Sequence, residues 1–282
     1  MKVYYSLYTL TPLRKANRLS SMRPINGVYL KGVLGNRILF ADYFPHISLG
    51  DDTCDQFLDE FKFQDFDYAR KVFDLLLRDR DLQKMAPQSF LNHQLWNPSE
   101  GADSPVIKYK LEDQLDRHFL SALKNGQRLR LDANALFSRN EYEAFVKTIP
   151  TKYLPQIDYI EDPMHDPDWP SMGIPVARDF IPAPRFDYYI YKPNCEFKPS
   201  TEVKIIYSSY LGSDLGRWHA YCELIENGDL SLTHGIYTEG FYQEEEKFMV
   251  GSYRNGFTAD KKIVNSVYDT IYNAKWKSLC SM

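Results

Sequence analysis

The sequence predicts a parallel β/α barrel preceded by a small α+β domain, and three observations carry this prediction. The first is length, because 282 residues are enough for one barrel-sized domain and a small one. The second is a rhythm of strand followed by helix that begins near residue 90. The third is a series of short β-rich runs that each end in a charged residue. A parallel barrel builds its active site in this way, at the C-terminal ends of its strands.

The clearest of these runs is Leu-Arg-Leu-Asp-Ala-Asn at 129–134. A strand alternates its side chains, so Arg130, Asp132 and Asn134 would share one face. Three polar groups on one side of a short apolar strand cost less free energy when the strand ends in a wet, charged pocket. A single carboxylate after a strand is often only a helix cap, and a single lysine is often a surface group. A series in chain order favours a common site, and the other runs end at Lys110, Glu161, Asp179 and Lys192.

Eight strands and several helices are expected between residues 90 and 237, which is the strand number of a barrel. The intervals between Asp179, Lys192 and Ser208 leave little room for full crossover helices, so we expect a barrel that is trimmed on that side. The expected strands lie near 90–95, 106–110, 128–133, 157–161, 174–178, 188–192, 203–208 and 231–237, and the helices near 111–124, 138–148 and 214–226.

Residues 1–87 read as the small domain, with strands followed by helices, and residues 88–256 as the barrel that holds the active site. The tail 257–282 contains a helical pattern and is expected to pack on the small domain. Two loops, 19–24 and 44–51, are either lids over a pocket or ordinary surface loops. Within the small domain we expect strands at 2–9, 27–33 and 37–43 and helices at 54–63 and 68–82, with a final helix at 263–275.

Composition excludes several classes of protein. Lys and Arg number 34 against 38 Asp and Glu, and the net charge of −4 gives no basic stripe for nucleic acid. No apolar run is long enough to cross a membrane, and the N-terminus lacks the apolar core of a secretion signal, so a cytoplasmic location is expected. The cysteines form no Cys-x-x-Cys pair and the histidines no zinc spacing, which argues against zinc and thioredoxin-like sites. The four cysteines are Cys54, Cys195, Cys222 and Cys280.

The remaining charges suggest metal-assisted proton abstraction. Asp132, Glu161 and Asp179 are three hard oxygen ligands, which suit Mg²⁺. Lys110 and Lys192 come from different walls of the expected barrel. A lysine beside a divalent cation loses its proton more readily, and the neutral amine is a general base. The fitting substrate is a small carboxylate whose α-proton is removed and whose developing charge the metal stabilises.

The series of motifs resembles the enolase superfamily, in its muconate-lactonizing branch. It consists of Lys108-Tyr109-Lys110, Arg130 to Asn134, Glu161-Asp162-Pro163, Asp179, Lys192-Pro193 and Ser208-Ser209. The similarity covers roughly residues 88–240. Within the branch it is most similar to the o-succinylbenzoate synthase family of menaquinone biosynthesis. The resemblance implies a (β/α)7β-type TIM barrel, partly trimmed, with a small N-terminal α+β capping domain.

The resemblance also implies a reaction, the syn dehydration of 2-succinyl-6-hydroxy-2,4-cyclohexadiene-1-carboxylate to o-succinylbenzoate through a metal-stabilised enediolate. By matching positions, Lys110 would take the α-proton and then help hydroxide to leave, and Lys192 would stabilise the anion from the opposite face. Asp132, Glu161 and Asp179 would carry Mg²⁺, with Mn²⁺ as a substitute. Substrate contacts would come from Lys108, Arg130, Asn134, Ser208 and Ser209.

Two alternatives stay open. An N-acylamino acid racemase, dipeptide epimerase or cycloisomerase of the same superfamily would keep the opposed lysines and Mg²⁺ and change only the substrate. The other alternative is a non-catalytic barrel that serves as a binding module. A scaffold, however, gains nothing from holding three carboxylates together when no positive charge compensates their repulsion.

Overall fold

The structure is a computed structural model. It describes residues 1–15, 22–47, 50–63, 67–96, 103–124, 126–170, 172–200, 202–237 and 240–282. Two of the loops singled out in the sequence are therefore described only in part. Residues 19–21 of the first loop and 48–49 of the second lie outside the described residues.

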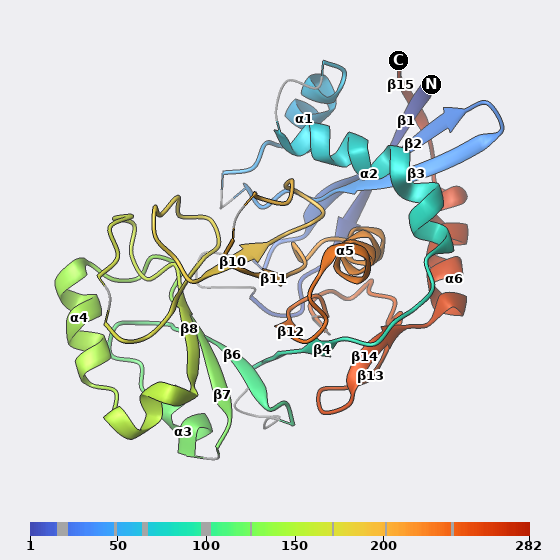
Figure 1. Ribbon diagram of the computed structural model, residues 1–282. Coiled ribbons are helices and arrows are strands. Elements are labelled where there is room, and N and C mark those ends of the chain that lie inside the picture. Colours follow the sequence, from blue (N-terminus) through green and yellow to red (C-terminus); the bar gives the residue numbers. More distant parts are fainter. Residues whose placement is uncertain are drawn as a thin grey trace.

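The small domain is a four-stranded antiparallel sheet covered by two helices (Figure 1). The predicted hairpin is confirmed, and its turn is made by Asn36 and by Gly35, whose φ of 59° lies in the left-handed region that favours glycine. Thr53 caps the first helix, because its side chain accepts the backbone N–H of Gln56. The elements are β1 (Lys2–Leu10), β2 (Ile25–Leu34), β3 (Arg37–Tyr43), α1 (Cys54–Phe61) and α2 (Asp67–Lys84).

The barrel strands follow one another in chain order and pair in parallel, as predicted. The last strand is linked back to the first, because His234 pairs with Asn92 and an isolated bridge joins Ser208 to Gly235. The ring of eight strand positions therefore closes. The strands are β4 (Leu91–Asn92) and β5 (Gln94–Leu95), which share the first position, then β6 (Val106–Lys110), β7 (Arg128–Asp132), β8 (Ile157–Glu161), β9 (Val176–Arg178), β10 (Tyr188–Tyr191), β11 (Lys204–Tyr207) and β12 (Thr233–His234).

The trimming of the barrel is confirmed. Among the described residues, no helix lies between β8 and β9, between β9 and β10, or between β10 and β11. Buried apolar side chains of the remaining crossovers, such as Phe119, Phe145 and Leu215, cover the outer face of the sheet. The crossover helices are α3 (Phe119–Lys124), α4 (Arg139–Lys147) with the short 3₁₀ helix η2 (Thr151–Gln156), and α5 (Asp214–Asn227).

The helix predicted over 111–124 is wrong in its first half, since α3 begins only at Phe119. The cause is Asp116, whose two carboxylate oxygens accept the hydroxyl of Tyr109 and whose Oδ1 also accepts the backbone N–H of His118. A side chain that bonds its own neighbouring backbone offers the chain an alternative to the helix. Leu115, which would have joined the apolar stripe, is exposed instead.

The C-terminal segment returns to the small domain. Its last strand pairs with β1, in which Lys2 stands opposite Ser281, so the two chain termini lie together (Figure 1). The sequence pattern missed both this strand and a hairpin before the final helix, where Phe257 pairs with Phe90. The elements are β13 (Met249–Ser252), β14 (Gly256–Ala259), α6 (Lys261–Tyr272) and β15 (Lys277–Ser281).

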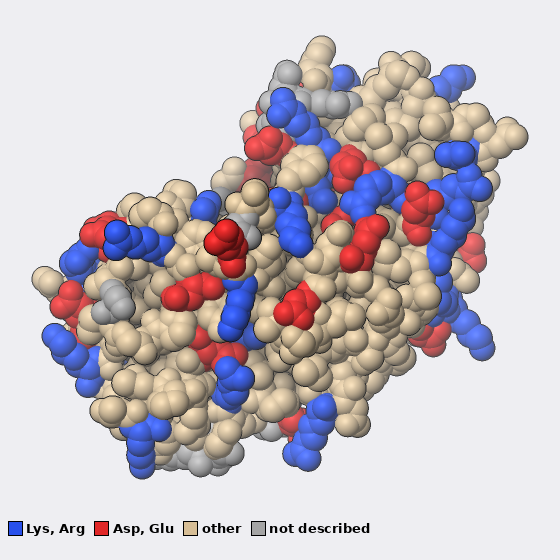
Figure 2. All heavy atoms as spheres, in the orientation of Figure 1, with Lys and Arg blue, Asp and Glu red and all other residues tan. Residues whose placement is uncertain are grey.

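A buried polar cluster joins the two parts of the molecule. Asp79 of α2 accepts hydrogen bonds from His219 of α5 and from Tyr268 of α6, and all of these residues are buried or half-buried. Satisfied buried polar networks hold elements in one arrangement. Figure 2 shows acidic and basic side chains mixed over the visible face, with no large patch of one sign. Among the described helices, none has the length and apolarity needed to span a bilayer.

Candidate active site

Parallel pairing brings the predicted charges to one end of the barrel. Lys110 stands opposite Asp132, and Asp132 opposite Glu161, in the last register positions of β6, β7 and β8. Asp179 and Lys192 follow the last residues of β9 and β10. All five residues therefore lie at the C-terminal ends of consecutive strands, where barrel enzymes place their active sites.

The two catalytic lysine candidates come from opposite walls. β6, which carries Lys110, and β10, which precedes Lys192, are four positions apart in a ring of eight strands. The three carboxylates come from the strands between them. A flat molecule bound in the centre of the ring would therefore face one lysine on each side.

Lys108 holds two of the carboxylates together. Its Nζ lies 2.8 Å from both carboxylate oxygens of Glu161 and 3.0 Å from Oδ2 of Asp132. Because Lys108 is two residues before Lys110 on the same strand, both side chains point into the barrel. Asp132 and Glu161 are buried, so the ammonium group compensates charges that would otherwise be costly.

The other two lysines differ in how closely they pair with a carboxylate. Lys192 Nζ lies 2.6 Å from Oδ2 of Asp179, whereas Lys110 Nζ lies 3.9 Å from Oδ2 of Asp132. The side chain of Lys110 is 29% exposed, against 11% for Lys108. Lys110 is therefore the amine that reaches furthest into the open end of the barrel.

The electrostatics of the two lysines differ. Burial is the largest effect on the pKa of Lys110 and lowers it. The carboxylates of Asp132 and Glu161 raise this pKa and the cations Lys108 and Lys192 lower it, and the net shift is downward. Burial also acts on Lys192, but the adjacent Asp179 carboxylate outweighs it and raises the pKa of that amine. Burial, together with the charges of Asp132 and Asp179, raises the pKa of Glu161 to about 7. The arrangement supplies one amine suited to accept a proton and one held as an ammonium ion.

The three carboxylates have the donor chemistry of a magnesium site. They are hard oxygen ligands, and the charges of Asp132 and Asp179 both act to raise the pKa of Glu161. As the side chains stand, however, no three His, Cys, Asp or Glu residues in the described part of the chain form a ready metal cluster. Lys108 and Lys192 occupy the carboxylate oxygens instead.

Asp162 is a site residue that was not singled out as one from the sequence. Its φ of 41° is unusual for a residue other than glycine, and its buried carboxylate accepts the backbone N–H groups of Asp179 and Phe180 at 3.1 and 2.9 Å. Burial beside Asp179 raises its pKa to about 8. Asp162 thereby fixes the chain that carries Asp179. The only sequence signal was an acidic residue between Glu161 and Pro163.

Arg130, predicted as a substrate contact, lies deeper in the barrel. Its Nε is 3.3 Å from Oδ2 of Asp158, and its Nη1 is 3.1 Å from Nδ1 of His93. An irregular register between β7 and β8 allows Asp158 to reach this position. Both ends of the guanidinium group are thus engaged by the barrel itself.

The other predicted contacts lie close to the carboxylates or at the last strands. The side-chain amide of Asn134 donates to Oδ1 of Asp132, and its backbone adopts a φ of 46°, which asparagine tolerates better than most residues. The hydroxyl of Ser208 lies 3.3 Å from the carbonyl oxygen of Gly235. The buried hydroxyl of Ser209 has no hydrogen-bond partner among the described residues.

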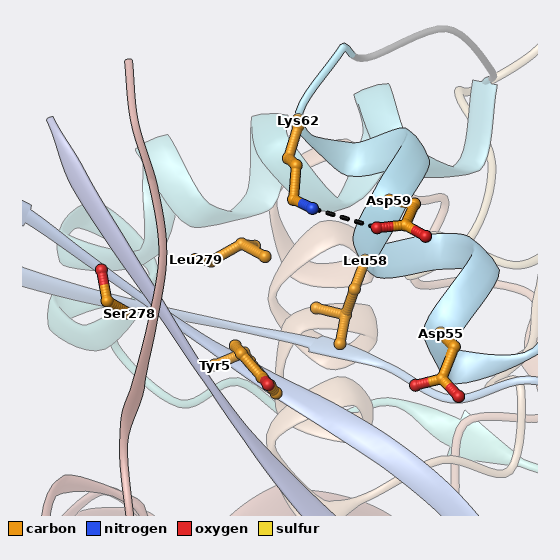
Figure 3. Close-up of a pocket in the computed structure, with 7 residues that line it drawn as sticks. All are labelled: Tyr5, Asp55, Leu58, Asp59, Lys62, Ser278 and Leu279. Carbon is orange, nitrogen blue, oxygen red and sulfur yellow. Dashed lines mark hydrogen bonds and ion pairs between the residues drawn. The ribbon is translucent and has the colours of Figure 1, made fainter.

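An open hollow on the small domain is separate from this end of the barrel. It lies between β1, α1 and β15, where Tyr5, Leu58 and Leu279 form part of its lining (Figure 3). Its charged members, Asp59 and Lys62, are already paired at 3.0 Å. None of the predicted site residues lines it.

Comparisons with known proteins agree with this fold. No protein-family model matches the chain. The o-succinylbenzoate synthase of Bdellovibrio bacteriovorus is 27% identical over an alignment 299 positions long, and the alignment covers 86% of this chain and 88% of that protein. The solved o-succinylbenzoate synthase of Thermosynechococcus elongatus, complexed with Mg in the active site, has a TM-score of 0.65 and 15% identity, over 87% of this chain and 95% of that one.

A second solved structure is the dipeptide epimerase of Enterococcus faecalis, complexed with Mg and the dipeptide L-Leu-L-Tyr. Its TM-score is 0.67 at 11% identity, over 92% of this chain and 96% of that one. The resemblance to the enolase superfamily, and most of all to o-succinylbenzoate synthases, is thus confirmed, as is the barrel with its N-terminal capping domain.

Proposed function

We propose that this chain catalyses the syn dehydration of 2-succinyl-6-hydroxy-2,4-cyclohexadiene-1-carboxylate to o-succinylbenzoate, in menaquinone biosynthesis and in the cytoplasm. The observation that carries the proposal is the placement of Lys110 and Lys192 on opposite walls, with three carboxylates on the strands between them. In this proposal residues 88–256 form the catalytic unit, and residues 1–87 with the tail 257–282 form the cap.

Asp132, Glu161 and Asp179 would hold Mg²⁺. When bound, the ion would act as a Lewis acid that stabilises negative charge on the carboxylate of the substrate. Lys108 now bonds both Glu161 and Asp132, so it would have to turn away from them, toward the substrate carboxylate. Once it has left Glu161 and Asp132, the ammonium group of Lys108 can neutralise the carboxylate of the substrate.

Lys110 would be the general base. Burial and two neighbouring cations lower its pKa, which favours the neutral amine that can accept a proton. The amine would take the α-proton of the substrate, and the resulting ammonium group would return that proton to the departing hydroxyl, which leaves as water. One residue on one face then serves both halves of a syn elimination.

Lys192 would stay an ammonium ion on the other face of the ring. Asp179 raises its pKa in spite of burial, and an ammonium group above a flat anion stabilises it by charge and by cation–π attraction. Asn134 would orient Asp132, and the free hydroxyl of Ser209, with Ser208, would contact the substrate. Arg130 would act from a greater depth, by holding the base of the site.

The direct test is an assay of the purified protein with the cyclohexadiene substrate and Mg²⁺, beside a panel of N-succinylamino acids. We expect aromatic product to form from the first and slower or no racemisation of the second. Racemisation without dehydration would replace the proposal by the second candidate. Binding without any turnover would indicate a non-catalytic barrel.

The second candidate is an epimerase or racemase of N-acylated amino acids. It is favoured by the same opposed lysines, since inversion at a carbon needs an acid and a base on opposite faces. The likeness to an epimerase structure agrees with it at the level of the fold. Unequal proton affinities of the two lysines favour dehydration, which needs only one base.

A further inference from the structure

A segment of the small domain reaches Tyr210, which stands beside Lys192. The hydroxyl of Tyr210 donates to Oδ2 of Asp51 at 2.8 Å, and Nε2 of His46 lies 2.7 Å from the carbonyl oxygen of Tyr210. A carbonyl oxygen only accepts hydrogen bonds, so Nε2 must carry the proton in this contact. Tyr210 is therefore held at both its side chain and its backbone by the small domain.

The holding segment is itself tied together. Oδ2 of Asp51 also accepts the backbone N–H of His46 at 2.6 Å. The same oxygen thus joins the two ends of the segment and the tyrosine hydroxyl. A change at Asp51 would release both contacts at once.

Aromatic neighbours fix the plane of the Tyr210 ring. The ring of His46 meets it edge-on, with centroids 4.6 Å apart, and the ring of Tyr68 lies 6.2 Å away at a steep angle. Lys192 Nζ lies 5.1 Å from the ring centroid, within the range of a cation–π interaction. The Tyr210 ring is thus contacted by His46 and Tyr68 of the small domain and by the ammonium group of Lys192.

Lys192 consequently has two anchors, the carboxylate of Asp179 and the ring of Tyr210. If Asp179 binds Mg²⁺, as the proposed function requires, its oxygens are shared with the metal and hold the ammonium group less tightly. The ring is then the anchor that remains. Its position depends on Asp51 and His46, which never touch the lysine in the described contacts.

We infer that Tyr210 is a positioning residue for Lys192, and that Asp51 and His46 of the small domain act on this lysine through Tyr210. The kinetic consequence of this inference rests on the proposed function. The effect of Tyr210 on the position of Lys192 does not depend on that function. Through Tyr210, the small domain would then set the position of the Lys192 ammonium group, which faces the ring of the substrate. A merely structural role for Tyr210 would leave the position of Lys192 unchanged.

The geometric test follows the ε-carbon signal of Lys192 by NMR in protein labelled with ¹³C at the lysine ε-carbon. Lys192→Arg identifies the signal by its loss. A nearby aromatic ring displaces such a signal, so we expect it to move in Tyr210→Leu. It should move in the same direction in Asp51→Ala, which removes the acceptor oxygen that holds Tyr210, although Asp51 does not touch the lysine.

Two controls accompany this measurement. Tyr8→Phe breaks another tyrosine–aspartate bond, from Tyr8 to Asp42, at 2.5 Å within the small domain, and should leave the Lys192 signal in place. Lys198, whose Nζ lies 5.9 Å from the ring of Tyr207, should keep its own signal in every variant. An unmoved Lys192 signal in Asp51→Ala would overturn the inference.

The kinetic test uses dehydration by the Mg²⁺-loaded protein. Asp51→Ala and Tyr210→Phe remove the same bond, so each should lower kcat by about three- to tenfold at nearly constant KM. The double variant should lose no more than either single one. Independent, additive losses would count against the inference. A moved NMR signal in a protein that fails to dehydrate the substrate would support the positioning and refute the proposed function.

Discussion

Lys108 bonds both carboxylate oxygens of Glu161, with its amine nitrogen 2.8 Å from each. The same nitrogen reaches Asp132, so a single ammonium group stands where the carboxylates of two strands converge. A bound Mg²⁺ would use the same carboxylate oxygens, so Lys108 and the metal would compete for them.

Replacing this lysine should expose that competition. In Lys108→Met the buried carboxylates of Asp132 and Glu161 lose their counter-charge, so we expect the metal-free protein to lose about 3 kcal/mol of unfolding free energy. Mg²⁺ should then raise the melting temperature by more in the variant than in the native protein. Thermal unfolding with and without Mg²⁺ checks both. An equal rise in the two proteins would show that Lys108 does not compete with the metal.

Lys110 should be separable from the metal site. Lys110→Ala removes the proposed base but none of the carboxylates, so Mg²⁺ should still raise the melting temperature. Exchange of the substrate α-proton in deuterated water should stop, because the pKa of Lys110 is lowered whereas those of its neighbours Lys108 and Lys192 are raised. NMR of the recovered substrate measures the exchange. Persistent exchange would remove Lys110 from the role of base.

Lys192 distinguishes the two candidate reactions. In Lys192→Arg the cation is kept but can no longer act as a base, because the guanidinium group does not lose its proton. A dehydratase should keep part of its activity, whereas a racemase should lose exchange from one of the two enantiomers. Exchange with each enantiomer of an N-succinylamino acid, measured beside dehydration, gives the comparison. Complete loss of dehydration would show that Lys192 does more than supply charge.

His234 should make stability depend on pH. Burial lowers its pKa to about 4, and its ring accepts the backbone N–H of Tyr207 at Nδ1, which requires the neutral form. Between pH 6.5 and 4 the unfolded chain takes up a proton here and the folded chain does not. The neutral His234 therefore contributes fully to the unfolding free energy above pH 6.5. This contribution, about 3 kcal/mol, is lost as the pH falls from 6.5 to 4.

The matched variant for this effect is His234→Asn, whose side-chain oxygen can still accept the N–H of Tyr207. Its unfolding free energy should decline less than that of the native protein between pH 7 and 4. Denaturant unfolding at several pH values measures the two declines. Parallel declines would mean that His234 does not titrate as its burial indicates.

The strand-end charges could be predicted from the sequence because the signal is local. A short apolar run with a polar alternate face, stopped at Asp132 or Glu161, carries its own period, and parallel pairing then brings such ends together. The trimmed crossovers likewise followed from the short intervals around Lys192. These features need no knowledge of distant partners.

What the sequence did not reveal depends on contacts between distant parts of the chain. β15 is a strand because β1, at the other terminus, lies beside it. The turn at 111–118 depends on where the side chain of Asp116 finds its donors, one of which is Tyr109. The role of Lys108 depends on the carboxylates that the next two strands bring to it, and the role of Asp162 depends on the backbone N–H groups of Asp179 and Phe180. Periodicity within a segment contains none of this information.

The most direct test of the site is a crystal structure of the protein soaked in Mn²⁺, which takes the place of Mg²⁺ and is located by anomalous scattering. We expect one ion about 2 Å from oxygens of Asp132, Glu161 and Asp179, with Lys108 turned away from Glu161. The peak should be absent in Asp132→Asn. An ion bound elsewhere, or three carboxylates that still face their lysines in saturating Mn²⁺, would contradict the account.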